Sequence, residues 1–262
     1  MQKNTLENML VSSGVQTWRA FKSIGSTNDE ALAWVDEEAP DFSLVIAEEQ
    51  TSGRGRFDRR WISKPGACLA FSLILRPHPG DHPNLALYAP LCGIAVRDAL
   101  TELFDLDVQI KWPNDVLISR QKCCGILVES VWTGDVLKGL VMGIGINITR
   151  DSLPPSENRL YPATSLEEAV NQKVDGLEVL RAVLHQITKW RPLVGSPTFF
   201  THWKRHLAYV GEEVMIVKSE KNSIIGIEKG IDRDGNLVII GPAHEEIMIE
   251  AGDLHLRPLT SP

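Results

Sequence analysis

The stretch Gln50-Thr-Ser-Gly-Arg-Gly-Arg-Phe-Asp-Arg-Arg-Trp61 determines how the rest of this sequence is interpreted. Largely apolar runs of strand length lie on both sides of it, at residues 42–47 and 68–75, and we predict a buried strand at each. A connection of this length inside a compact domain is usually functional or disordered. We call residues 50–61 the basic loop, because they contain four arginines and two glycines.

The basic loop has the composition of an anion-binding segment. Gly53 and Gly55 allow the backbone to bend tightly and a ligand to approach it closely. Arg54 and Arg56 flank Gly55, and guanidinium groups bind carboxylates and phosphates in a bidentate manner. Because it has little apolar surface, we expect the loop to be mobile until an anionic ligand pairs with these arginines. The same composition also fits a solvated loop or a nucleic-acid-binding arm, and composition alone does not decide between them.

The basic loop is one of four motifs that together resemble the signature of biotin–protein ligases. One such motif would be weak evidence, but all four occur in the order of that family, and the resemblance extends from about Trp18 to the C-terminus. The motifs are Gly53-Arg-Gly-Arg56 with Arg59 and Trp61, Lys111-Trp-Pro-Asn-Asp115, Lys122-Cys-Cys-Gly-Ile-Leu127 and Gly143-Ile-Gly-Ile-Asn147. The sequence departs from the family pattern at Cys68, Ala70 and Cys124, which bears on the shape of the pocket but not on the class of reaction.

The composition is that of an ordinary globular chain. Its 262 residues are 43% hydrophobic and carry a net charge of −7, so the protein as a whole is not built to bind nucleic acid. No stretch approaches the length of a membrane span, and residues 1–7 lack the apolar core of a secretion signal, so we expect a cytoplasmic protein with no membrane partner. The four cysteines form no Cys-x-x-Cys pair, which predicts buried free thiols.

Residues 26–28, Ser-Thr-Asn, precede a predicted helix that ends near Val35. Thr27 and Glu30 form a capping-box pattern, so plain helix capping explains these side chains from the sequence alone. Polar groups at a helix start can also bind a polar ligand. The resemblance favours the second explanation, because Ser-Thr-Asn at this place contacts the ureido ring of biotin in the family.

Three other polar positions have both a structural and a functional explanation. Residues 111–115 either form the turn of a β-hairpin or display polar groups at a strand end. Lys122, between two predicted strands, is either an ordinary surface lysine or directs its amine into a cleft. Gly143 and Gly145 mark either a bulge or the close approach of a ligand.

The predicted fold is α+β. A mixed β-sheet with helices packed on one face forms a catalytic domain at residues 1–208, and a small SH3-like β-barrel follows at residues 209–262. Residues 1–16 form either a short helix or a frayed tail. Asp234-Gly-Asn236 predicts a hairpin in the barrel. Helices are further predicted at residues 85–104, 177–194 and 198–207, and the barrel strands at residues 213–217, 223–227, 237–240 and 246–249.

No metal-binding residues are predicted. His202 and His206 are four residues apart on a predicted helix, which suits one face of a metal site. No third ligand is apparent in the sequence, so we expect both histidines on an exposed helix face.

The resemblance implies an ATP-dependent biotin–[biotin carboxyl-carrier protein] ligase. Biotin and ATP are its substrates and Mg²⁺ its cofactor; the reaction forms biotinyl-5′-AMP and pyrophosphate, and biotin then passes to a lysine of the biotin carboxyl carrier domain of a carboxylase. Longer family members carry an N-terminal DNA-binding domain, for which there is no room before Trp18, so neither repressor activity nor a DNA partner is expected. Members often dimerise through the sheet, which leaves a homodimer open.

The resemblance also implies roles for individual residues. Lys122 neutralises the biotin carboxylate and the α-phosphate, Arg56 closes over the adenylate, and Asp115 either holds Mg²⁺ indirectly or accepts a proton from the acceptor lysine. Trp112 and the strand at Leu127 supply an apolar slot for biotin. The implied biotin-binding residues are Ser26, Thr27, Asn28, Gln50, Gly53, Arg54, Arg56, Lys122, Gly125 and Gly143. The implied ATP-binding residues are Arg54, Arg56, Arg59, Trp61, Lys111, Trp112, Asn114, Lys122 and Asn147.

Two alternatives remain. A lipoate–protein ligase shares the architecture and the adenylate chemistry, but it should lack the Gly-Arg-Gly-Arg loop. A nucleic-acid-binding protein that uses the basic loop is opposed by the net charge of −7.

Overall fold

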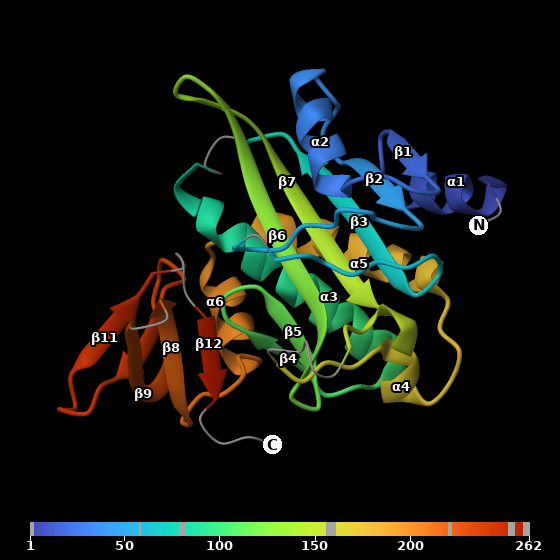
Figure 1. Cartoon of the computed structure of the whole chain (residues 1–262). Helices are drawn as coiled ribbons and strands as arrows, with labels where there is room; N and C mark the ends of the chain where they lie inside the picture. The colour runs from blue at the N-terminus through green and yellow to red at the C-terminus, as the bar shows by residue number, and fades with distance from the viewer. Residues whose placement is uncertain are drawn as a thin grey trace.

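The computed structural model describes residues 3–57, 59–78, 82–155, 161–219, 222–250 and 255–258. Its larger sheet has seven strands in the order β1-β2-β3-β7-β6-β5-β4 (Figure 1). β1 and β2 are parallel and the other neighbours antiparallel, which confirms the predicted mixed sheet. The strands are β1 (Trp18–Phe21), β2 (Ser43–Ala47), β3 (Cys68–Leu75), β4 (Val108–Lys111), β5 (Asp115–Ile118), β6 (Gln121–Thr133) and β7 (Val136–Asn147).

Two long helices cover one face of this sheet. α3 and α5 lie behind it in Figure 1, and the strand residues that point toward them, such as Leu44, Leu73 and Met142, are fully buried in the main core. No helix in the described ranges has both the length and the hydropathy needed to cross a membrane. The helices other than α2 are α1 (Lys3–Ser12), α3 (Tyr88–Phe104), α4 (Leu166–Val170), α5 (Gly176–Trp190) and α6 (Pro197–Arg205), with 3-10 turns η1 (His82–Leu87), η2 (Arg150–Ser152) and η4 (Arg191–Leu193).

The helix α2 (Thr27–Asp36) lies on the opposite face, so the expectation that helices cover one face only is wrong. Its Trp34 and Val35 pack against Val45 and Val141 of the sheet in a separate small core. Successive strand residues point to opposite faces, and here both sets are apolar, so both faces need cover. The N-cap of α2 is Ser26, whose hydroxyl accepts a hydrogen bond from the backbone of Asp29, rather than the predicted Thr27.

The C-terminal strands form a second, five-stranded antiparallel sheet in the order β11-β10-β9-β8-β12. Among the described strands no pairing joins β11 to β12, so closure into an SH3-like barrel stays a prediction, as does the domain boundary at residue 208. The strand β12 was not predicted. The strands are β8 (Glu213–Ser219), β9 (Asn222–Ile231), β10 (Leu237–Ile240), β11 (Glu246–Ile249) and β12 (His255–Pro258).

The predicted hairpin at residues 234–236 joins β9 to β10, and its tip contacts the turn between β4 and β5. The indole of Trp112 is 1% exposed and donates a hydrogen bond of 3.1 Å to the carbonyl of Gly235. Gly235 has a φ of +84°, and a β-carbon there would lie 2.8 Å from Leu87. Both the backbone angle and the lack of space for a β-carbon therefore favour glycine at position 235. The hydrogen bond from Trp112 connects the hairpin of the second sheet to the β4–β5 turn of the larger sheet.

His202 and His206 are not simply on an exposed helix face. His202 lies 2.8 Å from the carboxylate of Asp98, and its ring centroid lies 4.5 Å from that of Trp190, whose indole donates to the same carboxylate. Burial alone would raise the pKa of Asp98, but its hydrogen bonds with His202 and Arg97 lower it to about 2. In the part of the chain that the structure describes, no group of three His, Cys, Asp or Glu residues is arranged to hold a metal ion.

The Asp98 cluster predicts a pH dependence of stability. A carboxylate whose pKa is lowered by folding stabilises the protein above its unfolded pKa and loses this effect as the pH falls toward the folded pKa. Asp98→Asn should therefore lower the free energy of unfolding at neutral pH by about 2 kcal/mol, a difference that shrinks between about pH 4 and about pH 2. Urea unfolding of both proteins across this range measures it. A difference that does not change with pH would contradict the assignment.

Candidate active site

A cavity of about 550 Å³ lies on the α2 face of the larger sheet. It is enclosed by the start of α2, the basic loop, the turn between β4 and β5, and residues 161–163. Of the predicted site residues, only Gly53 and Trp112 do not line it. Those that do are Ser26, Thr27, Asn28, Gln50, Arg54, Arg56, Arg59, Trp61, Lys111, Asn114, Asp115, Lys122, Gly125, Gly143 and Asn147.

Three glycines form one wall of the cavity, and we call Gly125, Gly143 and Gly145 the glycine floor. Gly125 and Gly145 are cross-strand partners in β6 and β7. A β-carbon at Gly125 would lie 2.8 Å from the ring of Trp61, and one at Gly145 would lie 2.6 Å from its indole nitrogen. A β-carbon at Gly143 would overlap the amide of Asn28. The glycine floor therefore lets these side chains lie directly on the sheet.

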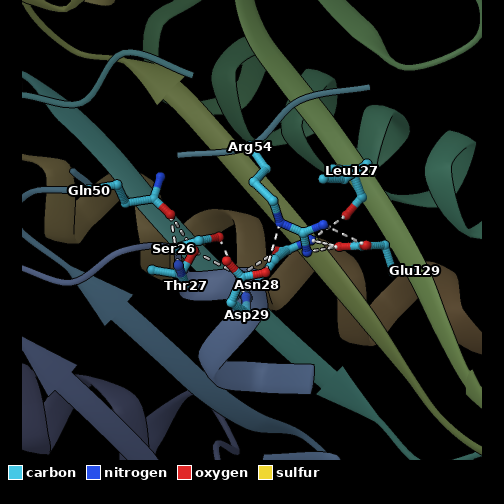
Figure 2. Close-up of polar contacts among 9 residues, drawn as sticks. Ser26, Thr27, Asn28, Asp29, Gln50, Arg54, Leu127 and Glu129 are labelled. Carbon is cyan, nitrogen blue, oxygen red and sulfur yellow. Dashed lines mark hydrogen bonds and ion pairs between the residues drawn. The ribbon is translucent and has the colours of Figure 1, made fainter. Parts of the chain in front are cut away.

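One end of the cavity is a hydrogen-bonded group of polar side chains (Figure 2). Asn28 donates from Nδ2 to the carboxylate of Glu129 and to the carbonyl of Leu127, at 2.8 and 3.2 Å. The hydroxyl of Ser72 lies 2.6 Å from Oδ1 of Asn28. Gln50 accepts from both the backbone N–H and the hydroxyl of Thr27, at 2.8 and 3.0 Å. These contacts fix the direction of the polar groups that face the cavity.

The other end carries a carboxylate between two lysines. The ammonium of Lys122 lies 2.5 Å from Oδ1 of Asp115, and that of Lys111 lies 3.3 Å from Oδ2. Burial alone would raise the pKa of Asp115, but the charges of Lys122 and Lys111 lower it to about 2. Burial lowers the pKa of Lys111 more than Asp115 raises it. With Arg59 close enough to contribute to that shift, this end has an excess of positive charge.

A β-bulge places Lys122 in the cavity. The pairing of β5 with β6 shifts register between Val116 and Leu117, so that Cys124 and Lys122 have partners but Cys123 has none. Cys123 and Cys124 are both buried in the core on the far side, whereas Lys122 and Gly125 both line the cavity. The extra residue thus turns the lysine to the ligand side. Lys122 lies within β6 and not between two strands as predicted.

The basic loop is held by contacts within the protein, and its ordering by a ligand anion stays a prediction. Arg54 makes a bidentate pair with Glu129, at 3.0 and 2.6 Å, and its Nε lies 2.8 Å from Asp29. Gly53 accepts a hydrogen bond of 2.8 Å from the backbone of Trp61. A β-carbon at Gly53 would lie 2.6 Å from the carbonyl of Trp61, so this glycine serves the loop's own closure.

Arg56 and the two predicted asparagines connect parts of the wall. Arg56 lies over the ring of Phe57 at 4.8 Å and donates a long hydrogen bond of 3.4 Å to Asn114. Asn114 donates to the carbonyl of Ile126 and Asn147 to that of Thr164, at 2.7 and 3.1 Å. Each asparagine therefore has its amide fixed by the backbone.

The cysteines that depart from the family pattern lie outside the cavity. All four cysteines are free and buried, as predicted. Cys124 points into the core below the glycine floor. Cys68 accepts a hydrogen bond of 3.1 Å from the indole of Trp61, so it acts on the cavity only through that ring.

Sequence reasoning missed several residues that form or support the cavity. Ser72 and Glu129 were detectable, because Ser72 is the lone hydroxyl residue in the apolar run 68–75 and Glu129 is the one charged residue in 123–133. Tyr161 had no local signal. Its segment pairs with the start of β6 through a hydrogen bond from Lys122 to Pro162, which brings the ring to 4.8 Å from the ammonium of Lys111. Trp112, predicted to bind ATP, points instead to the junction with the second sheet.

Comparison with known proteins is consistent with this arrangement. Residues 20–147 match the model of the biotin/lipoate A/B protein ligase family. A biotin–[acetyl-CoA-carboxylase] ligase of Paracoccus denitrificans is 33% identical over 85% of this chain and 94% of its own length. The bifunctional ligase/repressor BirA of Bacillus subtilis is 32% identical over 82% of this chain and 67% of its own length.

A solved structure of a biotin protein ligase is also similar to this chain. The biotin protein ligase from Aquifex aeolicus in complex with biotin and ATP is 29% identical, covers 93% of this chain and 99% of its own, and has a TM-score of 0.79. The chain therefore belongs to the biotin/lipoate A/B protein ligase family. Within that family it belongs to the biotin–protein ligases, and it is thus an enzyme.

The glycine floor gives a prediction for Gly143. In Gly143→Ala the added methyl group displaces the Asn28 amide, so the Kd for biotin should rise by about tenfold or more, the equivalent of one lost hydrogen bond to a charged or polar partner. Isothermal calorimetry measures it. Gly139→Ala is the control, because Gly139 lies in the same strand but against Val35, at 3.0 Å. If both variants bind biotin alike, the floor has no special role.

Proposed function

We propose that this enzyme activates biotin with ATP to biotinyl-5′-AMP and then transfers biotin to one lysine of the biotin carboxyl carrier domain of a carboxylase. The observation that carries the proposal is the two-ended cavity. Asn28 lies over Gly143, and the ammonium of Lys122 lies beside Gly125, which is the partner of Gly145 two residues further along β7. That spacing, about 7 Å along the strand, suits a ligand with a polar ring at one end and an anionic group at the other.

In the first step, a carboxylate oxygen of biotin attacks the α-phosphorus of ATP, and the bond from that phosphorus to the bridging oxygen breaks to release pyrophosphate. The two reactants are both anionic and repel each other. Lys122 lowers this repulsion, because its ammonium faces the cavity beside the glycine floor. Fixed positive charge aimed at the reacting phosphate is the main catalytic contribution in such transfers. Arg56, Arg59 and Lys111 add to it.

In the second step, the amine of the acceptor lysine attacks the carbonyl carbon of the mixed anhydride, and AMP leaves. The proton that the amine loses passes to a phosphate oxygen of the departing AMP or to water. Asp115, with a pKa of about 2, is a weak base and is engaged by two lysines. We therefore assign Asp115 the role of holding Lys122 and Lys111 in place, rather than that of proton acceptor.

Mg²⁺ enters this proposal as part of the nucleotide substrate. Asp115 is the one carboxylate among the described residues that line the cavity, and its oxygens face two ammonium groups. These residues do not form an oxygen cage for a metal ion. Mg²⁺ commonly keeps several waters and binds through substrate phosphates, which is compatible with this wall. Asn114 and Asn147 are assigned to the adenine or ribose.

The test is pyrophosphate release from ATP with biotin as the only added acid. Biotin should support release and lipoate should not, which separates the lipoate–protein ligase alternative. Release with neither acid, or with lipoate alone, would overturn the proposal. A DNA mobility shift that weakens with salt would instead revive the nucleic-acid alternative. Absence of repressor activity, the cytoplasmic location and the oligomeric state stay predictions or open questions.

Lys122 gives the first functional prediction. Lys122→Ala should abolish adenylate formation in a folded protein, because it removes the charge that screens two anions from each other. Pyrophosphate release measures it, with Lys138→Ala as a control for loss of a lysine from the neighbouring strand. Biotinyl-AMP formation within about tenfold of wild type, roughly 1.4 kcal/mol of barrier, would show that the assigned role is wrong.

Arg56 gives the second functional prediction. Arg56→Gly removes the contacts with Phe57 and Asn114 that join the basic loop to the wall. The variant should still make biotinyl-AMP but release it faster, so that exposed lysines of bystander proteins become biotinylated without the enzyme. Incubation with biotin, ATP and an unrelated lysine-rich protein measures this. Wild-type selectivity together with an unchanged adenylate off-rate would mean that Arg56 does not retain the intermediate.

A further inference from the structure

Glu129 occupies a place between two parts of the cavity wall without lining the cavity itself. It lies in β6, in the same row of outward positions as Gly125 and Leu127. Its carboxylate accepts hydrogen bonds from Asn28 at 2.8 Å and from Arg54 at 3.0 and 2.6 Å (Figure 2). One side chain thus contacts both the polar group at the start of α2 and the basic loop.

Glu129 determines which way the Asn28 amide points. A carboxylate and a backbone carbonyl only accept hydrogen bonds, so Glu129 and Leu127 require Nδ2 of Asn28 on their side. Oδ1 is then placed against the hydroxyl of Ser72, at 2.6 Å, directly over Gly143. If the acceptor at position 129 is lost, only the carbonyl of Leu127 still holds Nδ2, so this orientation of the amide is less strongly favoured.

Glu129 also holds the basic loop in place. Arg54 has both terminal nitrogens on Glu129 and its Nε 2.8 Å from Asp29 of α2. The guanidinium is therefore paired with two carboxylates of the protein. Bidentate arginine–carboxylate pairs of this geometry have both strength and a defined direction.

We propose that Glu129 is a positioning residue that sets biotin recognition by Asn28 and loop closure by Arg54 together. The inference rests on the proposed function of the cavity. Because one carboxylate serves both groups, a single change at this position should weaken the binding of biotin and also shorten the residence of biotinyl-AMP. Replacing Arg54 alone should shorten only the residence of biotinyl-AMP, because Asn28 keeps its three hydrogen-bond partners in that variant.

The test uses the isosteric variant Glu129→Gln, whose amide has one oxygen for two sets of donors. In Glu129→Gln, the Kd for biotin and the dissociation rate of biotinyl-AMP should each rise by about tenfold, while kcat for pyrophosphate release at saturating biotin stays within about threefold of wild type. In Arg54→Gln only the dissociation rate should rise. The double variant should dissociate no faster than the single variants, because both changes remove one contact.

Glu30→Gln is the matched control. Glu30 lies on α2 and pairs with Arg19 at 2.8 Å. The side chains of Arg19 and Glu30 are 32% and 26% exposed, close to the 36% and 25% of Arg54 and Glu129. It should bind biotin and retain the adenylate as wild type does. Thermal unfolding of every variant shows whether the fold is kept.

The outcomes separate the inference from the function on which it rests. If wild type makes no biotinyl-AMP, the proposed function fails. If wild type makes it and Glu129→Gln matches Glu30→Gln in both biotin affinity and adenylate dissociation, the positioning role alone is overturned. A rise in only one of the two constants would show that Glu129 does not couple the two groups, which also overturns the inference.

Discussion

The cavity depends on the glycine floor, a part of the larger sheet where three residues have no side chain. Both faces of the larger sheet need cover: α3 and α5 supply it on one side, and on the other the apolar residues of α2 pack against the part near Val45, Ile74 and Val141. Beyond that part lie Gly125, Gly143 and Gly145, against which the side chains of Asn28 and Trp61 rest directly. A helix there would leave no room for a ligand. The basic loop instead covers this part, and a cavity remains beneath it.

Cationic side chains outnumber carboxylates among the described residues that line the cavity. Asp115 balances part of the charge of Lys111 and Lys122 and stays ionised because of them. On the other side, Glu129 and Asp29 engage Arg54. Of the two arginines that were expected to bind ligand anions, the structure thus uses Arg54 to hold the loop and places Arg56 beside Asn114 on the wall.

Motifs and periodicity predicted most strands and helices, since runs such as residues 42–47 and 68–75 are apolar for the whole length of a strand. They did not predict that α2 covers the second face, because burial on both faces gives no alternation to read. The bulge at Cys123 depends on the exact register between β5 and β6, and the approach of Tyr161 depends on a bridge between Lys122 and the distant Ala163; the hydrophobic pattern encodes neither. Trp112 was placed in the site because it stands within a motif, but its indole bonds Gly235, more than a hundred residues away.

The central claim is that the cavity above the glycine floor binds biotin at the Asn28 end and the activated carboxyl at the Lys122 end. A crystal structure with a non-hydrolysable analogue of biotinyl-AMP tests it most directly. The account predicts the ureido ring within hydrogen-bonding distance of Asn28 and the phosphate within hydrogen-bonding distance of Nζ of Lys122, with the alkyl chain between them beside the ring of Trp61. An analogue bound with its ends reversed, or bound outside this cavity, would contradict it.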